Sequence, residues 1–82
     1  MNKISLGPFL KAVRKKKKMS QVELSEYLGY TSQFISNWER GVSYPPIKAL
    51  QMLKDVLQIP PQQLLAVLVR DSQIPFQEIF KK

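Results

Sequence analysis

Residues 20–41 read SQVELSEYLGYTSQFISNWERG and contain two short helical patterns separated by a glycine. The first pattern begins at Ser20 with Glu23 three residues later, the spacing of a capping box in which the two residues satisfy each other's backbone N–H groups. The apolar positions of this pattern are Leu24, Tyr27 and Leu28. Gly29 predicts the end of the helix, because glycine readily takes the left-handed conformation.

The second pattern follows after one turn. Thr31 can cap the N-terminus of a helix, and Ile35 and Trp38 lie three residues apart, so both are expected to face the core. Gly41 predicts the end of this second helix. Two helices of about eight or nine residues, joined by a tight turn that contains glycine, are typical of a helix-turn-helix motif.

Helical periodicity continues on both sides of the motif. A first helix is expected to start near residues 5–8, because Pro8 is tolerated in a first turn. Its apolar stripe is Leu6, Phe9, Leu10 and Val13. A fourth helix is expected from Pro45 and Pro46 to about Leu57. Its inward positions are Ile47, Leu50, Leu53, Val56 and Leu57.

A fifth helix is expected after Pro60 and Pro61, and residues 64–69 make it apolar on all sides. The pattern breaks at Asp71 and Ser72, and the residues after Pro75 form either a tail or a short helix. The sequence therefore predicts an all-α fold, a compact five-helix bundle with a short sixth helix as an alternative to the tail. We expect one domain over residues 1–70 and a separate C-terminal element over residues 71–82.

The composition argues against several classes of function. The 82 residues contain no cysteine and no histidine, so thiolate metal ligands, disulfides and the most common general base are missing. We therefore expect no enzymatic activity, no metal and no cofactor. No stretch reaches the roughly 20 apolar residues of a membrane span, and the N-terminus lacks the apolar segment of a signal peptide. The sequence predicts a cytoplasmic protein without a membrane partner.

Basic residues are concentrated near the N-terminus. The chain has 13 Lys and Arg against 6 Asp and Glu, a net charge of +7. Residues 1–22 contain seven of these bases and no acid, so the remaining six bases balance the six acids. Such a patch fits a polyanion, with nucleic acid the first candidate and an anionic membrane surface the second. A solvated basic stretch that only aids solubility is the alternative.

The outward face of the second motif helix is polar and carries no acid. Its members are Ser32, Gln33, Ser36, Asn37 and Arg40. Gln and Asn can each form two parallel hydrogen bonds with the edge of an adenine, and Ser can donate or accept. Because a helix-turn-helix places its second helix in the major groove, this face favours base contact with DNA over an inert surface.

Residues 5–65 resemble the Cro/CI-type helix-turn-helix family of phage repressors and bacterial regulators, also called XRE-like. The resemblance is carried by S-Q-x-x-L and L-G within residues 20–29, I-S-x-x-E-x-G at residues 35–41, and Pro45. It implies a lambda-repressor-like fold in a bacterial or phage-encoded protein. It further implies sequence-specific binding of double-stranded DNA and a role as a small transcriptional regulator, most often a repressor.

The resemblance also implies roles for single residues. The base-reading positions are Ser32, Gln33, Ser36 and Asn37. Gln21 and Arg40 match positions at which the family contacts phosphate. Lys17, Lys18 and Tyr44 are further expected phosphate contacts, which come from the basic run and the flank of the recognition helix rather than from the resemblance. Arg14 and Glu39 match a pair that forms a structural salt bridge between the first and third helices. Lys18 stands where relatives often have glycine, so the turn after the first helix is expected to differ, and Tyr30 and Tyr44 either donate to phosphate or pack.

A homodimer on a palindromic operator is expected, because one recognition helix touches only a few base pairs. Apolar residues that the core cannot all bury are candidates for the interface: Leu65, Val69, Phe76, Ile79 and Phe80. The alternative is that the tail folds back over the fifth helix. A second class of function is an antitoxin, which would bind DNA for autoregulation and a protein partner through residues 66–82. A third class is an RNA or membrane binder.

Overall fold

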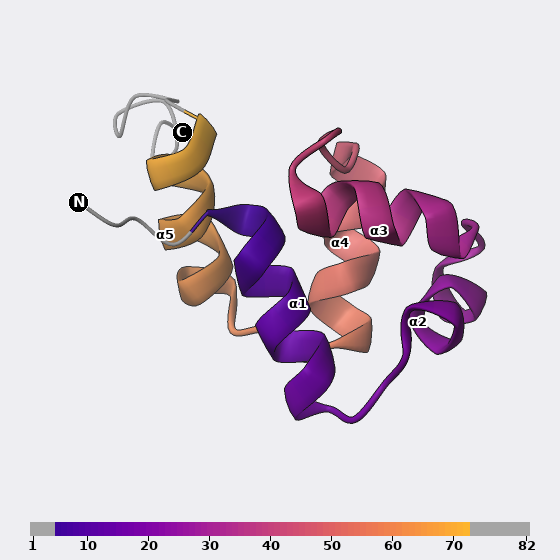
Figure 1. Cartoon of the computed structure of the whole chain (residues 1–82). Coiled ribbons are helices and arrows are strands. Elements are labelled where there is room, and N and C mark those ends of the chain that lie inside the picture. Colours follow the sequence, from indigo (N-terminus) through magenta and orange to yellow (C-terminus); the bar gives the residue numbers. More distant parts are fainter. Residues whose placement is uncertain (1–4, 73–82) are drawn as a thin grey trace.

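The computed structural model describes residues 5–72, which form five α-helices and no strand (Figure 1). The helices are α1 (Leu6–Lys16), α2 (Gln21–Leu28), α3 (Ser32–Arg40), α4 (Ile47–Val56) and α5 (Pro61–Ser72). The predicted all-α bundle of five helices is confirmed. The proposed sixth helix, with Phe76, Ile79 and Phe80, lies outside the described residues.

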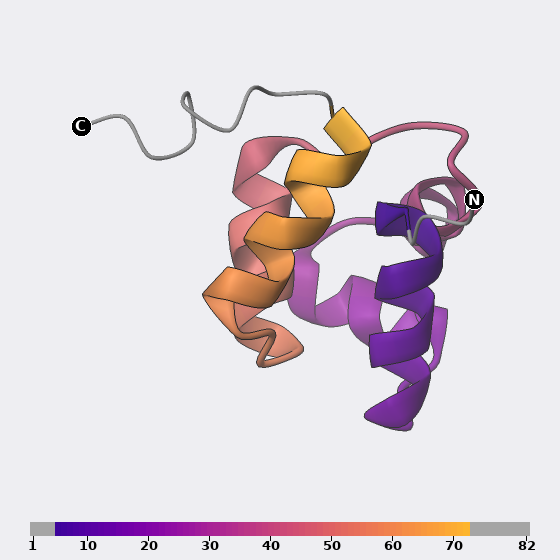
Figure 2. The same cartoon turned by 90° about the vertical axis from the view of Figure 1, so that its left-hand side faces the viewer.

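The helix α1 lies between α3 on one side and α5 on the other (Figure 1). The two motif helices, α2 and α3, pack against each other, and α2 also contacts α4. Figure 2, seen from the α5 side, shows α5 on the near face of the molecule and α3 nearly end-on behind the start of α1. The motif is therefore supported from behind by α1 and α4, and the outer face of α3 is left open.

The core is formed by apolar side chains from all five helices and the turns between them. Its buried members are Leu6, Phe9, Leu10, Leu24, Leu28, Ile35, Trp38, Ala49, Leu50, Leu53, Leu57, Ile59, Leu64 and Val67. The first turn of α1 approaches the end of α3 so closely that a Cβ on Gly7 would lie 2.5 Å from the carbonyl oxygen of Glu39. Gly7 therefore fixes the spacing between α1 and α3.

Four helix ends use a residue in the left-handed conformation. Gly29 (φ 77°) and Gly41 (φ 78°) end α2 and α3, as the sequence predicts. Lys18 (φ 60°) and Gln58 (φ 56°) take the same conformation after α1 and α4 without being glycine. The N–H of Met19 donates to the carbonyl of Arg14 at 3.2 Å, and that of Lys18 to Lys15 at 2.9 Å, the two bonds of a Schellman motif. The turn after α1 thus keeps the geometry that glycine favours, and the expected difference at Lys18 is wrong.

Two residues that the periodicity places in the core are exposed. Tyr27 is 68% exposed and Ile47 is 71% exposed. The short α2 buries its Leu24 and Leu28 edge, and Tyr27 lies beside that edge. In α4 the buried side is formed by Ala49, Leu50 and Leu53. Ile47 lies two positions before Ala49, about 200° around the helix, and therefore faces away from that residue.

One predicted cap and one predicted helix end also differ from the structure. Thr31 is the N-cap residue of α3, as predicted, but its side chain accepts no capping hydrogen bond from the described part of the chain. The expected break at Asp71 and Ser72 is wrong, because α5 continues through both residues. The carboxylate of Asp71 accepts a hydrogen bond from the Tyr44 hydroxyl, which ties the last turn of α5 to the loop before α4.

Candidate nucleic-acid interface

The orientation of α2 is set at its first turn. The Glu23 N–H donates to Ser20 Oγ at 3.0 Å, and the Ser20 N–H donates to Glu23 Oε1 at 2.8 Å. This is the capping box that the sequence predicts, with both bonds present. Since the box satisfies two backbone donors locally, α2 begins at a defined residue and places Gln21 in its first turn.

A buried ionic cluster joins the first three helices. Arg14 on α1 donates to both carboxylate oxygens of Glu39 on α3, from Nε at 2.6 Å and from Nη2 at 3.0 Å. Arg14 also donates to the carbonyl of Met19, and Gln21 on α2 donates to Glu39 at 3.0 Å. The hydrogen bond to Glu39 raises the pKa of Arg14 by more than burial lowers it. The cluster holds α3 in one position relative to α1 and α2.

Side-chain hydrogen bonds link the polar residues on the outer face of α3 to one another. Gln33 Nε2 donates to Asn37 Oδ1 at 3.1 Å, and Arg40 Nη2 donates to the same oxygen at 2.9 Å. Arg40 Nε also donates to Ser36 Oγ at 3.3 Å. The structure therefore brings together three of the four predicted base-reading residues with Arg40. The fourth, Ser32, lies at the start of the helix and is half-buried, as are Ser36 and Asn37.

The other residues predicted to contact phosphate differ in whether their side chains already form hydrogen bonds within the protein. Lys17 Nζ donates to Gln58 Oε1 at 2.7 Å, which links the turn after α1 to the turn after α4. Lys18 is exposed. Burial and the hydrogen bond to Asp71 raise the pKa of Tyr44 to about 12. The Tyr44 hydroxyl is therefore a donor already used by a carboxylate.

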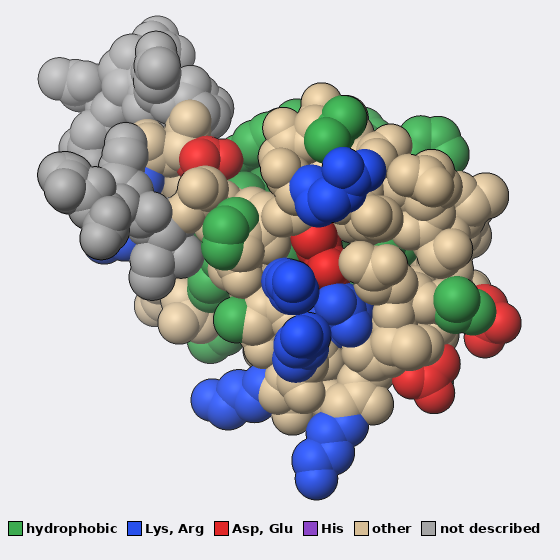
Figure 3. Space-filling view, viewed as in Figure 1, with side chains coloured by type: hydrophobic (Ala, Val, Ile, Leu, Met, Phe, Trp, Pro, Cys, Tyr) green, Lys and Arg blue, Asp and Glu red, His purple; other side chains and the backbone are tan. Residues whose placement is uncertain are grey.

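Basic and acidic side chains lie on different sides of the helix-turn-helix motif. Figure 3 shows Lys and Arg side chains gathered over α1 and α3 on the face that carries the recognition helix, and acidic side chains over α2 at its edge. A basic surface around a polar helix face without acids suits a duplex, because phosphates flank the major groove into which the helix would fit.

Three aromatic side chains pack against one another along one side of α3. Tyr30, Phe34 and Trp38 are spaced four residues apart, and their ring centroids lie 5.1–6.1 Å from one another. Trp38 is buried as the sequence predicts, and Tyr30 packs on it rather than standing free. The i, i+4 spacing of these three residues is the signal that could have predicted the cluster.

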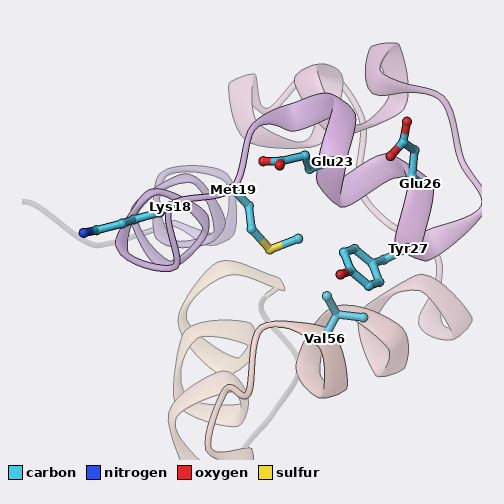
Figure 4. A pocket seen from close by; sticks show the side chains of 6 residues that line it. All are labelled: Lys18, Met19, Glu23, Glu26, Tyr27 and Val56. Atoms are coloured by element: carbon cyan, nitrogen blue, oxygen red, sulfur yellow. The ribbon is translucent and has the colours of Figure 1, made fainter.

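A groove of about 650 Å³ lies between the turn after α1, α2 and the end of α4. Figure 4 shows Met19, Tyr27 and Val56 close together, with Glu23 and Glu26 on α2 beside them and Lys18 pointing away. No three metal-ligating side chains come together anywhere in residues 5–72. None of the helices in this range is long and apolar enough to cross a membrane.

Comparison with known proteins agrees with this geometry. A family model described as helix-turn-helix matches residues 10–64. The chain belongs to the Cro/CI-type helix-turn-helix family. It therefore has the DNA-binding fold of regulators of this family. A search of curated protein sequences finds no match.

Two solved structures of this family resemble the chain closely. One is the P22 c2 repressor protein in complex with a synthetic operator, 34% identical with a TM-score of 0.73, covering 79% of this chain and 98% of that one. The other is the DNA-binding domain of the P22 c2 repressor in solution, 37% identical with a TM-score of 0.73, covering 79% and 86%.

Proposed function

We propose that this protein represses transcription by binding a palindromic DNA operator, with α3 in the major groove. The observation that carries the proposal is the outer face of α3, where Gln33, Ser36 and Asn37 stand on a helix fixed from behind. Amide and hydroxyl groups of this kind pair with base edges, whereas phosphate contacts alone carry no sequence information. The P22 c2 repressor, which has the same fold, is described in complex with a synthetic operator.

Phosphate contacts would set the register of α3 on the duplex. Gln21 lies in the first turn of α2, where free backbone N–H groups favour an anion. Its side chain is already oriented by Glu39. Lys17 and Lys18 extend the basic surface from the turn after α1, and Arg40 adds a charge at the end of α3. Together these groups would contact the DNA phosphates on both sides of the major groove.

We further propose a homodimer whose two copies read two half-sites. Leu65 and Val69 remain half-buried on α5, on the part of the helix that the core does not cover. A patch that meets itself across a two-fold axis would pair two recognition helices. Half-sites about 34–36 Å apart, one turn of DNA, would then be read together. Residues 71–82 are proposed to extend this interface.

The experiment that tests the proposal is selection of bound duplexes from a random DNA pool by the full chain. The expected result is one enriched motif with two inverted half-sites separated by about one helical turn. A pool that stays unenriched while the protein still retains DNA would show binding through phosphates alone, and would contradict a sequence-specific repressor.

A further inference from the structure

The carbonyl oxygen of the Asn37 side chain accepts two hydrogen bonds at once. Gln33 Nε2 donates to it from one side at 3.1 Å, and Arg40 Nη2 from the other at 2.9 Å. A carbonyl oxygen has two lone pairs. Both are therefore used within α3, before any ligand arrives.

Arg40 fixes the orientation of both amides. A guanidinium has only donors, so the Asn37 atom that faces Arg40 must be the oxygen. The Gln33 atom that faces this oxygen must then be a donor, which is Nε2. The usual ambiguity between the oxygen and nitrogen of an amide is thus removed by one charged neighbour.

The two amides consequently offer different groups to a ligand. Within residues 5–72, Gln33 Oε1 accepts no hydrogen bond, so Gln33 still offers one acceptor and one N–H. Asn37 offers two N–H donors and no free lone pair. An adenine edge presents one donor and one acceptor, whereas a guanine edge presents two acceptors, N7 and O6.

We propose that Arg40 sets the base preference of the recognition helix by occupying the acceptor of Asn37. Gln33 then reads adenine, and Asn37 reads guanine by donating from its amide nitrogen to N7 and O6. Arg40 acts here as a positioning residue, whatever phosphate it also touches. The inference rests on the proposed function, since it assigns the bases that the same face would read.

Selection from a random duplex pool tests this with six forms of the full chain: wild type, Gln33→Ala, Asn37→Ala, Arg40→Met, Arg40→Lys and Asn37→Asp. The two alanine variants locate the base pair that each amide contacts, because preference is lost there. Arg40→Met removes the donor to Asn37, whereas Arg40→Lys keeps a charge and a donor. All substituted side chains lie on the surface of α3, and helical circular dichroism checks that each variant is folded.

In the wild type, the pair located by Gln33→Ala should select adenine, and the pair located by Asn37→Ala should select guanine. In Arg40→Met the ratio of guanine to adenine at the Asn37 pair should fall about tenfold, since the freed oxygen can accept from adenine. Arg40→Lys should keep the ratio within about threefold of the wild type. Asn37→Asp replaces the donor amide by a second acceptor oxygen and cannot donate. It should therefore lose guanine at the Asn37 pair and retain adenine at the Gln33 pair.

Two results would overturn the inference and leave the proposed function standing. One is a wild-type motif with adenine at the Asn37 pair, and the other is an unchanged guanine-to-adenine ratio in Arg40→Met. A wild type that enriches no motif at all would instead overturn the proposed function, and this inference with it.

Discussion

Arg14 in α1 holds the carboxylate of Glu39 at the end of α3 through two hydrogen bonds of 2.6 and 3.0 Å, and each residue is only 6% exposed. Loss of one partner leaves a buried charge without compensation, so Arg14→Ala and Glu39→Ala should each lower the free energy of unfolding by about 3–5 kcal/mol. The double variant should cost less than the sum, because both changes remove the same interaction. Urea unfolding followed by circular dichroism measures all three.

An exposed ion pair in the same chain supplies the control. Lys54 Nζ lies 3.2 Å from Asp55 Oδ1, and the two side chains are 36% and 75% exposed. Lys54→Ala should therefore lower the free energy of unfolding by less than about 1 kcal/mol. A loss from Arg14→Ala no larger than that from Lys54→Ala would contradict a structural role for the buried pair.

The left-handed conformation of Lys18 predicts a stabilising substitution. At φ 60° a side chain strains the backbone, by roughly 1–2 kcal/mol relative to glycine. Lys18→Gly should therefore raise the melting temperature, although the extra freedom of glycine in the unfolded chain offsets part of the gain. Lys16→Gly, inside the last turn of α1, is the matched control and should lower it by removing a good helix former. Equal shifts in both variants would show that strain at Lys18 is negligible.

The raised pKa of Tyr44 predicts a loss of stability in alkaline solution. Its pKa is about 12 in the folded chain against an ordinary value of 10.0. The neutral phenol is thus favoured by folding, and its contribution is complete below pH 10 and is lost as the pH rises towards 12. Ultraviolet absorbance should show one tyrosine titrating near pH 12, and Tyr44→Phe should remove that step. A titration curve that keeps the step in Tyr44→Phe would disprove the assignment.

Salt dependence should report the phosphate contacts of the basic end. Each neutralised phosphate releases condensed counterions, so the logarithm of affinity should fall with the logarithm of salt by roughly 0.9 per contact. Replacing lysines 15–18 by Gln should flatten this slope and weaken binding to all duplexes alike. Fluorescence anisotropy over a salt series measures it, and an unchanged slope would assign these lysines to solubility alone.

Local features of the sequence predicted helix boundaries well, because their causes act within a few residues. Ser20 and Glu23 form the capping box, and Gly29 and Gly41 end their helices, as their own conformational preferences require. Burial of Tyr27 and Ile47 was predicted wrongly. A helical period says which residues can share a face, but not how wide a face the neighbouring helices cover.

In the candidate site, too, local features could be predicted from the sequence, whereas contacts between side chains could not. The polar face of α3 follows from helical spacing alone, so its members could be identified in the sequence. The bonds from Arg40 to Asn37 and from Lys17 to Gln58 could not, because they depend on rotamers and, for the second, on two turns 41 residues apart. These bonds join side chains that the sequence presented as separate contacts.

The central claim is that α3 reads bases, and the affinity of Gln33→Ala for two duplexes tests it most directly. On the best selected site the substitution should cost about 1–3 kcal/mol, whereas on a random duplex of the same length it should cost much less. Gln51→Ala, on the exposed face of α4, should change neither affinity. Equal losses from Gln33→Ala on both duplexes would contradict base reading by this helix.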